Sequence, residues 1–232
     1  MNKTVVVTGA SQGLGLCLAK EGIKRGYKVF ALDINIGDEL AALDGCENYI
    51  CDVTDYNSVH RCKEVIEQKA SCVDILFNNA GIWLDNKRLM IDDPDFDFDI
   101  IFRQFDVNAV GVVRMMREFL PLIERSTTKS VINMSSEAGS VKDCWRKGEY
   151  GYCMSKAAQN MVTKILQNAY PQITFYAVHP GWMITPQGMA GASKDASPNQ
   201  APSDTAKKLY DMAEDKKIEY LYCDFEGNRL EF

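Results

Sequence analysis

A short β-branched run near the N-terminus, Thr4-Val-Val-Val-Thr8, leads directly into a turn that contains three glycines. Apolar runs of this length bounded by glycine are typical of strands buried on both faces of a parallel sheet. The turn reads Gly9-Ala-Ser-Gln-Gly13-Leu-Gly15, and a helical pattern follows from Leu14 to about Arg25. A buried strand followed at once by a helix predicts the start of an α/β domain.

The same turn is a candidate phosphate site. Glycines let the backbone approach a ligand closely, and the first turn of a helix offers free N–H groups and the positive end of its dipole. The spacing is Gly-x-x-x-Gly-x-Gly and not the commoner Gly-x-Gly-x-x-Gly fingerprint, so a plain glycine-rich turn is the alternative. The place between strand and helix favours a nucleotide. Its expected contacts in the turn are Gly9, Ser11, Gln12, Gly13, Leu14 and Gly15.

The second expected strand, Lys28-Val-Phe-Ala-Leu-Asp33, ends in a carboxylate. Asp33 follows the glycine turn by about the distance at which an acidic residue binds the ribose hydroxyls of adenosine. A carboxylate there would repel the 2′-phosphate of NADP, and neither Gln12 nor residues 34–37 supply a cation. NAD is therefore expected and NADP is less favoured. The alternative is an Asp that only caps the next helix.

Strand-like and helical patterns alternate along the rest of the chain. Strands are expected at about 48–53, 73–77, 130–134, 173–178 and 219–223, and helices at about 56–69, 98–124, 153–170 and 203–214. Between them, residues 85–99 and 186–203 have the composition of loops, and we expect the second to be mobile. The alternation predicts a parallel sheet with helices on both faces. We expect one domain over residues 1–232, because the chain contains no linker-like segment.

Small and polar residues gather where the expected strands end, which is where ligands bind in open α/β sheets. Residues 78–81 (Asn-Asn-Ala-Gly) follow the fourth strand, Ser135-Ser136 follow the fifth, and residues 179–185 (His-Pro-Gly-Trp-Met-Ile-Thr) follow the sixth. Asn108 lies inside the expected helix 98–124, where asparagine is unfavourable, and this indicates a buried local role.

Tyr152 and Lys156 are four residues apart in the next helix, so they lie on one face of it. A cation beside a phenol favours the phenolate and lowers the tyrosine pKa from about 10. Tyr152 is thus a candidate proton donor and acceptor near neutral pH. The alternative is a solvated helix face, on which this spacing is common.

Composition excludes several function classes. The 232 residues carry a net charge of -6 and no basic run, which argues against a nucleic-acid partner. Neither a membrane-spanning run of roughly 20 apolar residues nor a signal-peptide pattern occurs, so we expect a cytoplasmic protein without a membrane partner. The eight cysteines form no CxxC pair, and His60 and His179 are far apart in sequence. Reduced thiols are therefore expected in place of disulfides or a metal site.

The chain resembles the short-chain dehydrogenase/reductase family over essentially its whole length, because seven motifs stand in the family's order. They are Thr8-Gly9-x-x-x-Gly13-x-Gly15, Asp52-Val53, Asn78-Asn79-Ala80-Gly81, Asn108, Ser136, Tyr152-x-x-x-Lys156 and Pro180-Gly181-x-x-x-Thr185. The resemblance implies a Rossmann-type, doubly wound parallel sheet of about seven strands in the order 3-2-1-4-5-6-7.

The resemblance also implies a role for each matching residue. Tyr152 would be the general acid/base, Ser136 would hydrogen-bond the substrate oxygen, and Lys156 would bind the nicotinamide ribose and lower the pKa of Tyr152. Asn108 would anchor a water that relays protons to Lys156. Ser136 is preferred to Ser135 because the family's serine lies three residues before the glycine. The further cofactor contacts would be Asp52, Val53, Asn79, Ala80, Gly81, Pro180, Gly181, Met183 and Thr185.

We expect an oxidoreductase that interconverts a secondary alcohol and a ketone by hydride transfer with a nicotinamide cofactor. The alternatives are a non-catalytic NAD-binding sensor or scaffold and an NADPH-dependent carbonyl reductase, because residues 222–229 resemble the C-terminus of short family members that often reduce carbonyls with NADPH. An epimerase or dehydratase of the same fold is a further option. Trp83, Trp145 and Trp182 are the expected substrate contacts beside Ser136 and Tyr152. Further pocket candidates are Ile82, Glu137, Cys144 and Met189.

Apolar residues exceed one face on two of the expected helices, and this predicts a homodimer or homotetramer. On helix 98–124 the surplus is Val112, Val113, Met115, Met116 and Phe119. On helix 153–170 it is Met154, Met161, Val162 and Ile165. The chain is slightly short for the family, so the lid over the substrate is expected to be small.

Overall fold

Seven strands form one parallel sheet in the order β3-β2-β1-β4-β5-β6-β7. The computed structural model describes residues 3–194 and 196–232, so residues 1, 2 and 195 of the expected domain lie outside it. The order confirms the one implied by the family resemblance. The strands are β1 (Thr4–Thr8), β2 (Lys28–Asp33), β3 (Cys46–Ile50), β4 (Ile75–Asn78), β5 (Ser130–Met134), β6 (Thr174–His179) and β7 (Tyr222–Asp224).

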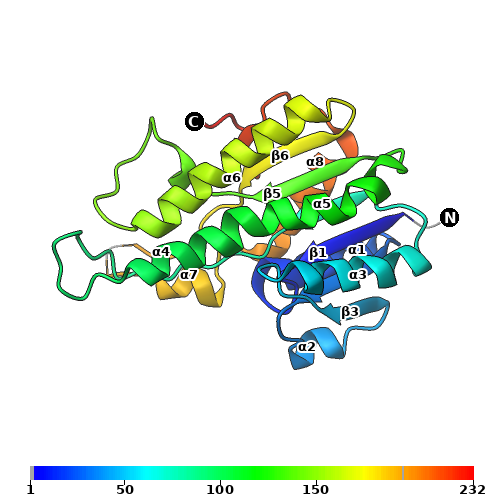
Figure 1. The fold of residues 1–232 in the computed structure, drawn as a ribbon, viewed down its shortest axis with the longest axis horizontal. Coiled ribbons are helices and arrows are strands. Elements are labelled where there is room, and N and C mark those ends of the chain that lie inside the picture. The colour runs from blue at the N-terminus through cyan, green and yellow to red at the C-terminus, as the bar shows by residue number, and fades with distance from the viewer. Residues whose placement is uncertain (1–2, 195) are drawn as a thin grey trace.

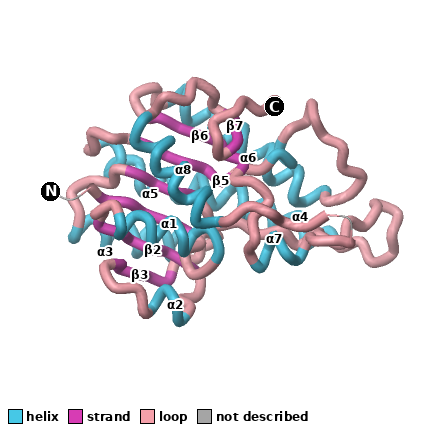
Figure 2. Tube along the Cα trace, turned by 180° about the vertical axis from the view of Figure 1, so that it is seen from behind, coloured by secondary structure: helices cyan, strands magenta, loops and turns pink. Residues whose placement is uncertain are grey.

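Helices cover both faces of this sheet (Figures 1 and 2). One face carries α1 and α8, and the other carries α3, α5 and α6. The helices are α1 (Gly13–Lys24), α2 (Asp38–Ala41), α3 (Tyr56–Lys69), α4 (Phe98–Phe105), α5 (Gly111–Glu124), α6 (Tyr150–Ala169), α7 (Pro186–Ala190) and α8 (Pro202–Asp215).

The side chains of β1 show why the sheet needs two covering layers. Val5 and Val7 point into the cluster under α1 and α8, where they meet Leu18 and Tyr210. Val6 points into the opposite cluster, which includes Phe119 of α5. All three valines are fully buried, as expected for a strand with apolar residues on both faces. The apolar run at residues 4–8 is therefore the centre of the core.

The strand order reverses beside β1, because the chain first builds β2 and β3 on one side and then β4 on the other. Loops that leave β1 and β4 run to opposite faces of the sheet, and a crevice opens between them at the carboxyl ends. The glycine turn after β1 and residues 79–81 after β4 form its walls. The topology therefore places the predicted cofactor motifs together.

Two segments differ from the sequence-based expectation. The expected helix over 98–124 is divided, because a π-helical segment at Asp106–Val110 joins α4 to α5. The expected mobile loop over 186–203 begins with the short helix α7, which Pro186 starts and Thr185 caps by accepting a hydrogen bond from the N–H of Gly188. Both differences lie next to the crevice.

The expected apolar surplus is present on one helix and largely absent on the other. Met154, Met161 and Ile165 of α6 are between 51% and 61% exposed. Of the five residues named on α5, Val113 is 46% exposed, and the other four form the face that packs toward the sheet: Val112, Met115, Met116 and Phe119. Two phenylalanines of α4, Phe98 and Phe102, are exposed instead.

All eight cysteines are free thiols. Within residues 3–194 and 196–232, His, Cys, Asp and Glu form no group of three or more that could hold a metal ion. The helices in the described part of the chain are all too short or too polar to cross a bilayer.

Candidate active site

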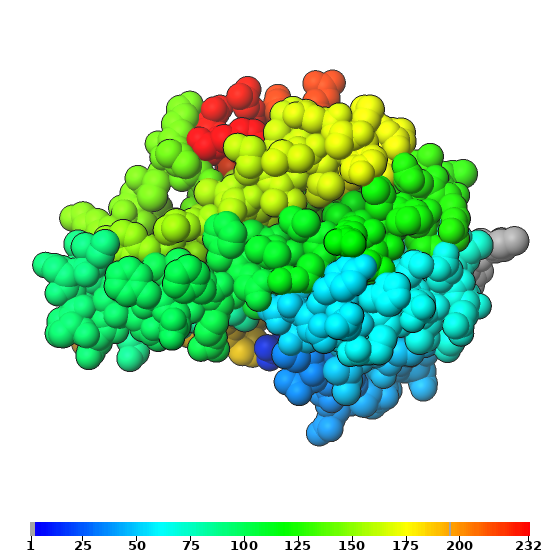
Figure 3. Space-filling model, viewed as in Figure 1, coloured from blue at the N-terminus to red at the C-terminus, as the bar shows by residue number. Residues whose placement is uncertain are grey.

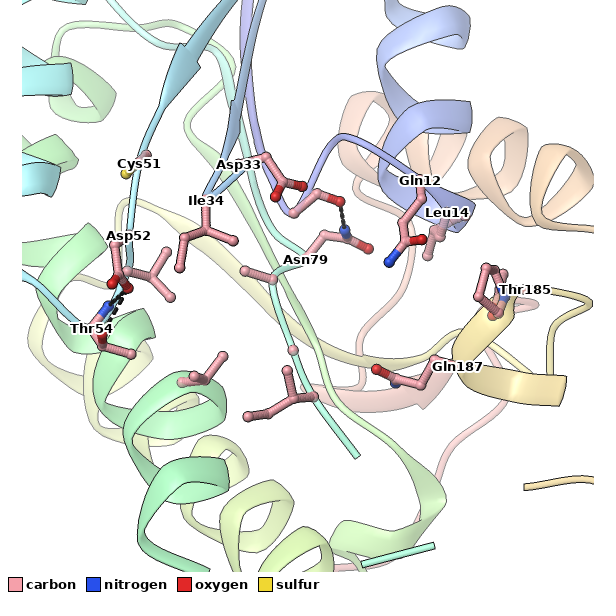
Figure 4. Close-up of a pocket in the computed structure, with 18 of the residues that line it drawn as sticks. Gln12, Leu14, Asp33, Ile34, Cys51, Asp52, Thr54, Asn79, Thr185 and Gln187 are labelled. Atoms are coloured by element: carbon pink, nitrogen blue, oxygen red, sulfur yellow. Dashed lines mark hydrogen bonds between the residues drawn. The ribbon is translucent and has the colours of Figure 1, made fainter. Parts of the chain in front are cut away.

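A cleft of about 550 Å³ opens at the carboxyl ends of β1, β2 and β4. Figure 4 shows Asp52 and Thr54 on one side of this cleft and Thr185 and Gln187 on the other, with Asn79 between them. The cleft brings together most of the predicted cofactor contacts: Gly9, Gln12, Gly13, Leu14, Asp33, Asp52, Val53, Asn79, Ala80, Gly81, Met183 and Thr185. A volume of this size suits an extended small ligand.

The remaining predicted cofactor residues support the cleft from behind. Gly15 packs under the turn, because a Cβ on it would lie 2.0 Å from the carbonyl oxygen of Gly9. Gly181 has a φ of +85°, and the carbonyl of Pro180 accepts a hydrogen bond from Thr205 of α8. These two residues shape the turn after β6 and do not line the cleft.

Sequence reasoning missed several lining residues, namely Ile34, Cys51, Thr54, Arg103, Asp106, Val107, Pro186 and Gln187. Arg103, Asp106 and Val107 come from the end of α4 and the π-helical segment. An uninterrupted helix would have given these three residues a different orientation. Helical periodicity therefore could not predict that they line the cleft. Gln187 is two residues after Thr185, and that proximity was the one available clue.

The glycine turn is tied to β4 by two side chains. Asn79 donates from Nδ2 to the carbonyl oxygens of Thr8 and Gly9 at 2.9 and 3.0 Å. The Thr8 hydroxyl in turn accepts hydrogen bonds from the backbone N–H groups of Asn79 and Ala80. Gly9 has a φ of +64°, and a Cβ on it would lie 2.8 Å from the Cα of Ala80. The two strand ends therefore form one rigid wall.

Asp33 lies at the rim of the cleft, where its carboxylate is oriented by backbone N–H groups. Oδ2 accepts from Ser11 at 2.9 Å and Oδ1 accepts from Asn35 at 3.2 Å. The Ser11 hydroxyl also donates to the carbonyl of Asn35. This arrangement explains why Ser11 matters although it does not line the cleft, since it positions the carboxylate.

Tyr152 lies in the first turn of α6 beside Trp83, and their ring centroids are 5.5 Å apart. Desolvation raises the pKa of the Tyr152 phenol above its ordinary value, and a hydrogen bond with Ser136 opposes the rise. The main charges that act on Tyr152 come from Glu137, Arg146 and Cys153, and the lowering of its pKa by Lys156 stays a prediction.

Lys156 is 4% exposed and lies on the same helix face as Tyr152, as its spacing predicted. Its Nζ is 5.7 Å from the Tyr152 ring centroid and donates to the carbonyl of Met134 at 2.6 Å and to Oε1 of Gln159 at 3.1 Å. Burial lowers the pKa of Lys156 to about 7. The amine is therefore held by the last residue of β5 and by Gln159 in the middle of α6, and not by the phenol.

Asn108 is fully buried in the π-helical segment, as its unfavourable helical position indicated. Its Oδ1 accepts from the N–H of Ile82 at 2.8 Å, and its Nδ2 donates to the Ile82 carbonyl and to the Ser155 hydroxyl, each at 2.9 Å. A Cβ on Gly81 would lie 3.3 Å from Oδ1 of Asn108 and 3.6 Å from Nζ of Lys156. The extra residue of the π-turn thus brings Asn108 close to Lys156.

Ser136 and Ser135 have separate roles. Ser135 is buried and donates to Oδ1 of Asn160 at 2.5 Å, so its hydroxyl holds β5 to α6. The Ser136 hydroxyl hydrogen-bonds Tyr152 and donates to Oε2 of Glu137 at 2.6 Å. These contacts support the choice of Ser136 over Ser135.

A partly buried cluster of charged residues extends from Glu137 to residues that sequence reasoning did not select. Arg146 donates to Oε1 of Glu137 at 2.6 Å and to Oε2 of Glu149 at 2.9 Å. The Nδ1 atom of His179 lies 3.6 Å from Oε2 of Glu137. Desolvation would raise the pKa of Glu137, but His179, Arg146 and Ser136 outweigh it and lower the pKa to about 2.

The three tryptophans proposed as substrate contacts lie in different surroundings. Trp83 packs on Tyr152, and a Cβ on Gly191 would lie 2.2 Å from its ring. Trp182 donates from Nε1 to the carbonyl of Gly188 at 3.0 Å and so holds α7. Trp145 is 68% exposed beside the guanidinium of Arg146, and it is not brought to Tyr152.

Comparisons with known proteins agree on one family. The family model described as short chain dehydrogenase matches residues 3–196. Oxidoreductase UcpA of Salmonella typhimurium is 32% identical over 89% of this chain and 80% of that protein. The 1-hydroxy-2-glutathionyl-2-methyl-3-butene dehydrogenase of a Rhodococcus species is 27% identical over 95% of this chain and 96% of its own.

Solved structures share the fold. NADPH-bound carbonyl reductase from chicken fatty liver has a TM-score of 0.83 and 22% identity, with 100% of this chain and 99% of that chain covered. The 3-ketoacyl-(acyl-carrier-protein) reductase from Brucella melitensis, complexed with NADH, has a TM-score of 0.83 and 23% identity, with 96% of each chain covered.

Proposed function

The chain belongs to the short-chain dehydrogenase family of oxidoreductases, and from that premise we propose that it interconverts a secondary alcohol and a ketone by hydride transfer with NAD. The observation that carries this proposal is the proximity of Lys156, which lies on one helix face with Tyr152, to Gly81 at the edge of the cleft. Gly81 joins the cleft to this helix face, because it lines the cleft and adjoins Nζ of Lys156.

The residues of the cleft fit a dinucleotide. The start of α1 and the glycine turn would hold the pyrophosphate, since N–H groups at a helix N-terminus bind anions. Asp33 would accept hydrogen bonds from the adenosine ribose, and Asp52 and Val53 would contact the adenine end. Thr185 and Met183 would lie at the nicotinamide end. When bound, the nicotinamide supplies the site that accepts or donates hydride.

Ser136 and Tyr152 would stabilise the negative charge on the reacting oxygen, and Tyr152 would also transfer its proton. In ketone reduction negative charge grows on that oxygen, and hydroxyl donors placed there lower the barrier. Tyr152 would give its proton to this oxygen, and in the reverse direction the phenolate would take the proton of the alcohol. Lys156 would turn from the Met134 carbonyl toward the ribose, and its ammonium would then favour the phenolate.

Asp33 is the observation that favours NAD over NADP. Its carboxylate is held in place at the rim of the cleft by Ser11 and Asn35, and residues 34–37 carry no cation for a 2′-phosphate. Equilibrium titration of both reduced cofactors tests this choice. Binding of NADPH tighter than that of NADH would overturn it.

The substitution Tyr152→Phe tests the reaction itself. It keeps the ring against Trp83 but removes the proton, so turnover should fall by about 10²–10⁴-fold, the range credited to general acid–base catalysis. NAD affinity should be retained, because the cleft is unchanged. Reduction of NAD with a panel of secondary alcohols measures turnover. Near-native turnover in the variant would contradict the proposal.

Location and assembly are part of the same proposal. A cytoplasmic enzyme accounts for the eight free thiols, since disulfides are rare in that compartment. A homodimer accounts for the exposed apolar residues of α4 and α6, which a second copy would cover.

A further inference from the structure

We propose that Glu137 selects the substrate: its carboxylate accepts a hydrogen bond from a hydroxyl group on the carbon next to the reacting one, so that vicinal diols and α-hydroxy ketones are favoured. This inference rests on the proposed alcohol–ketone reaction, and it names the class of substrate for that site. The observation behind this inference is the hydrogen bond from Ser136, the serine beside Tyr152, to Glu137.

The position of Glu137 sets which substrate atoms it can reach. Its Oε2 lies 2.6 Å from the Ser136 hydroxyl, which would contact the reacting oxygen. The two oxygens of a vicinal diol are themselves roughly one hydrogen-bond length apart, about 2.8 Å. A substrate whose first oxygen contacts Ser136 can therefore place a neighbouring hydroxyl on the carboxylate.

Both oxygens of the carboxylate have partners, and Oε2 accepts hydrogen bonds from the Ser136 hydroxyl at 2.6 Å and from the N–H of Ala138 at 3.1 Å. Arg146, 11% exposed, holds Oε1 and is itself fixed by Glu149, which is 2% exposed. The Glu137 side chain remains 40% exposed, so its free lone pairs are accessible from outside the cluster. An ionised carboxylate only accepts hydrogen bonds. A ligand atom that fits here must be a donor.

The charge of the cluster excludes a substrate carboxylate at this place. The single guanidinium of Arg146 is shared by two carboxylates, Glu137 and Glu149. Arg88 lies 3.5 Å from Glu149 on the far side of the cluster. Burial lowers the pKa of His179 and so disfavours its charged form. An acid group on the substrate would meet an ionised Glu137 with no free cation within the described cluster.

The hydrogen bond from Ser136 to Glu137 links selection to rate. While Ser136 donates to Glu137, its proton is not available to the reacting oxygen. A substrate hydroxyl that donates to Glu137 takes over this bond and releases the Ser136 proton toward the charge that develops in the transition state. A simple ketone or alcohol lacks this hydroxyl group, so it should be turned over more slowly and also bind more weakly.

Butane-2,3-diol and butan-2-ol test the proposal, because they differ only in the neighbouring hydroxyl. In the wild-type enzyme kcat/KM for NAD reduction should be roughly 10- to 100-fold higher with the diol, the range of one hydrogen bond to a charged group. Lactate, which carries a carboxylate on the neighbouring carbon, should be the poorest of the three.

In the variant Glu137→Ala the ratio of the two kcat/KM values should fall toward one, and the rank of lactate should rise. Glu137→Gln keeps a carbonyl oxygen for Arg146 and serves if the alanine variant unfolds. Its ratio of kcat/KM values should lie between those of the wild type and of the alanine variant. Asp143→Asn removes a nearby exposed carboxylate outside the cluster and should leave the ratio unchanged.

The outcomes separate this inference from the function on which it rests. Equal kcat/KM for diol and butan-2-ol in the wild type, or an unchanged ratio in both Glu137 variants, would overturn the selection by Glu137 and leave the alcohol–ketone reaction standing. A wild-type protein that binds NAD in a titration but oxidises none of a broad panel of alcohols would overturn both.

Discussion

At the scale of residues, Lys156 shows how strongly burial changes a charge. Its pKa is lowered to about 7, from an ordinary value near 10.4, so the unfolded state binds more protons between these values and stability rises with pH across that window. Lys156→Met removes the buried amine, and the variant should melt several degrees higher than the wild type below pH 7, at roughly 2–4 °C per kcal/mol. The difference should shrink as the pH approaches 10.4. The variant also loses the hydrogen bond to the Met134 carbonyl, and this loss lowers its melting temperature by the same amount at every pH. Thermal unfolding from pH 6 to 9.5 measures this, with Lys164→Met on the exposed side of α6 as the control. A difference that does not change with pH would contradict the shift.

At the scale of elements, the segment of α7 that ends at Gly191 packs against Trp83. A Cβ on Gly191 would lie 2.2 Å from two ring atoms of Trp83, and Trp182 holds α7 through the Gly188 carbonyl. Gly191→Ala should push this segment away from the indole, at a cost of about 1–3 kcal/mol for overpacking. We expect faster proteolytic cleavage within 186–200 and a higher KM for the alcohol, because the segment no longer covers the substrate. Ala190→Ser adds one atom at the exposed neighbouring position and should change neither. Unchanged cleavage in the Gly191 variant would show that the contact does not hold the segment.

At the scale of the whole molecule, α4 and α6 lie side by side on the face that Figure 3 presents, α4 in green and α6 in yellow-green to yellow. Phe98, Phe102, Met154, Met161 and Ile165 are each more than half exposed there, and a patch of this kind marks a protein interface. We expect a homodimer in light scattering at micromolar concentration, which Met161→Asp should dissociate. Val141→Asp changes a residue that is 77% exposed in the 140–149 loop, outside both helices, and should leave the dimer intact. A 26.0 kDa monomer in the wild type would refute the interface.

Local patterns of residues determined the fold and the cofactor half of the site. Val5, Val6 and Val7 are apolar on both faces, and only a strand covered by two helical layers buries all three. Glycines 9, 13 and 15 stand next to that strand because the backbone there approaches another chain segment or a ligand. The apolar strand and the glycine turn each depend on residues that are close in sequence, so the spacing of those residues predicts them. The strand order came from the resemblance to a family, since spacing alone does not order a sheet.

Long-range side-chain partners were decided only by the tertiary structure. The spacing of Tyr152 and Lys156 placed them on one helix face, but the Met134 carbonyl and the surrounding core, distant in sequence, set the partner and pKa of Lys156. Arg146 lies in a loop with no periodic pattern, so its bonds to Glu137 and Glu149 could not be predicted. In the π-helical segment, the amide of Asn108 hydrogen-bonds the backbone of Ile82, which is 26 residues away in sequence. Burial and hydrogen bonding depend on which segments of the chain are neighbours in space. Those neighbours are distant in sequence, so they are known only once the whole chain has folded.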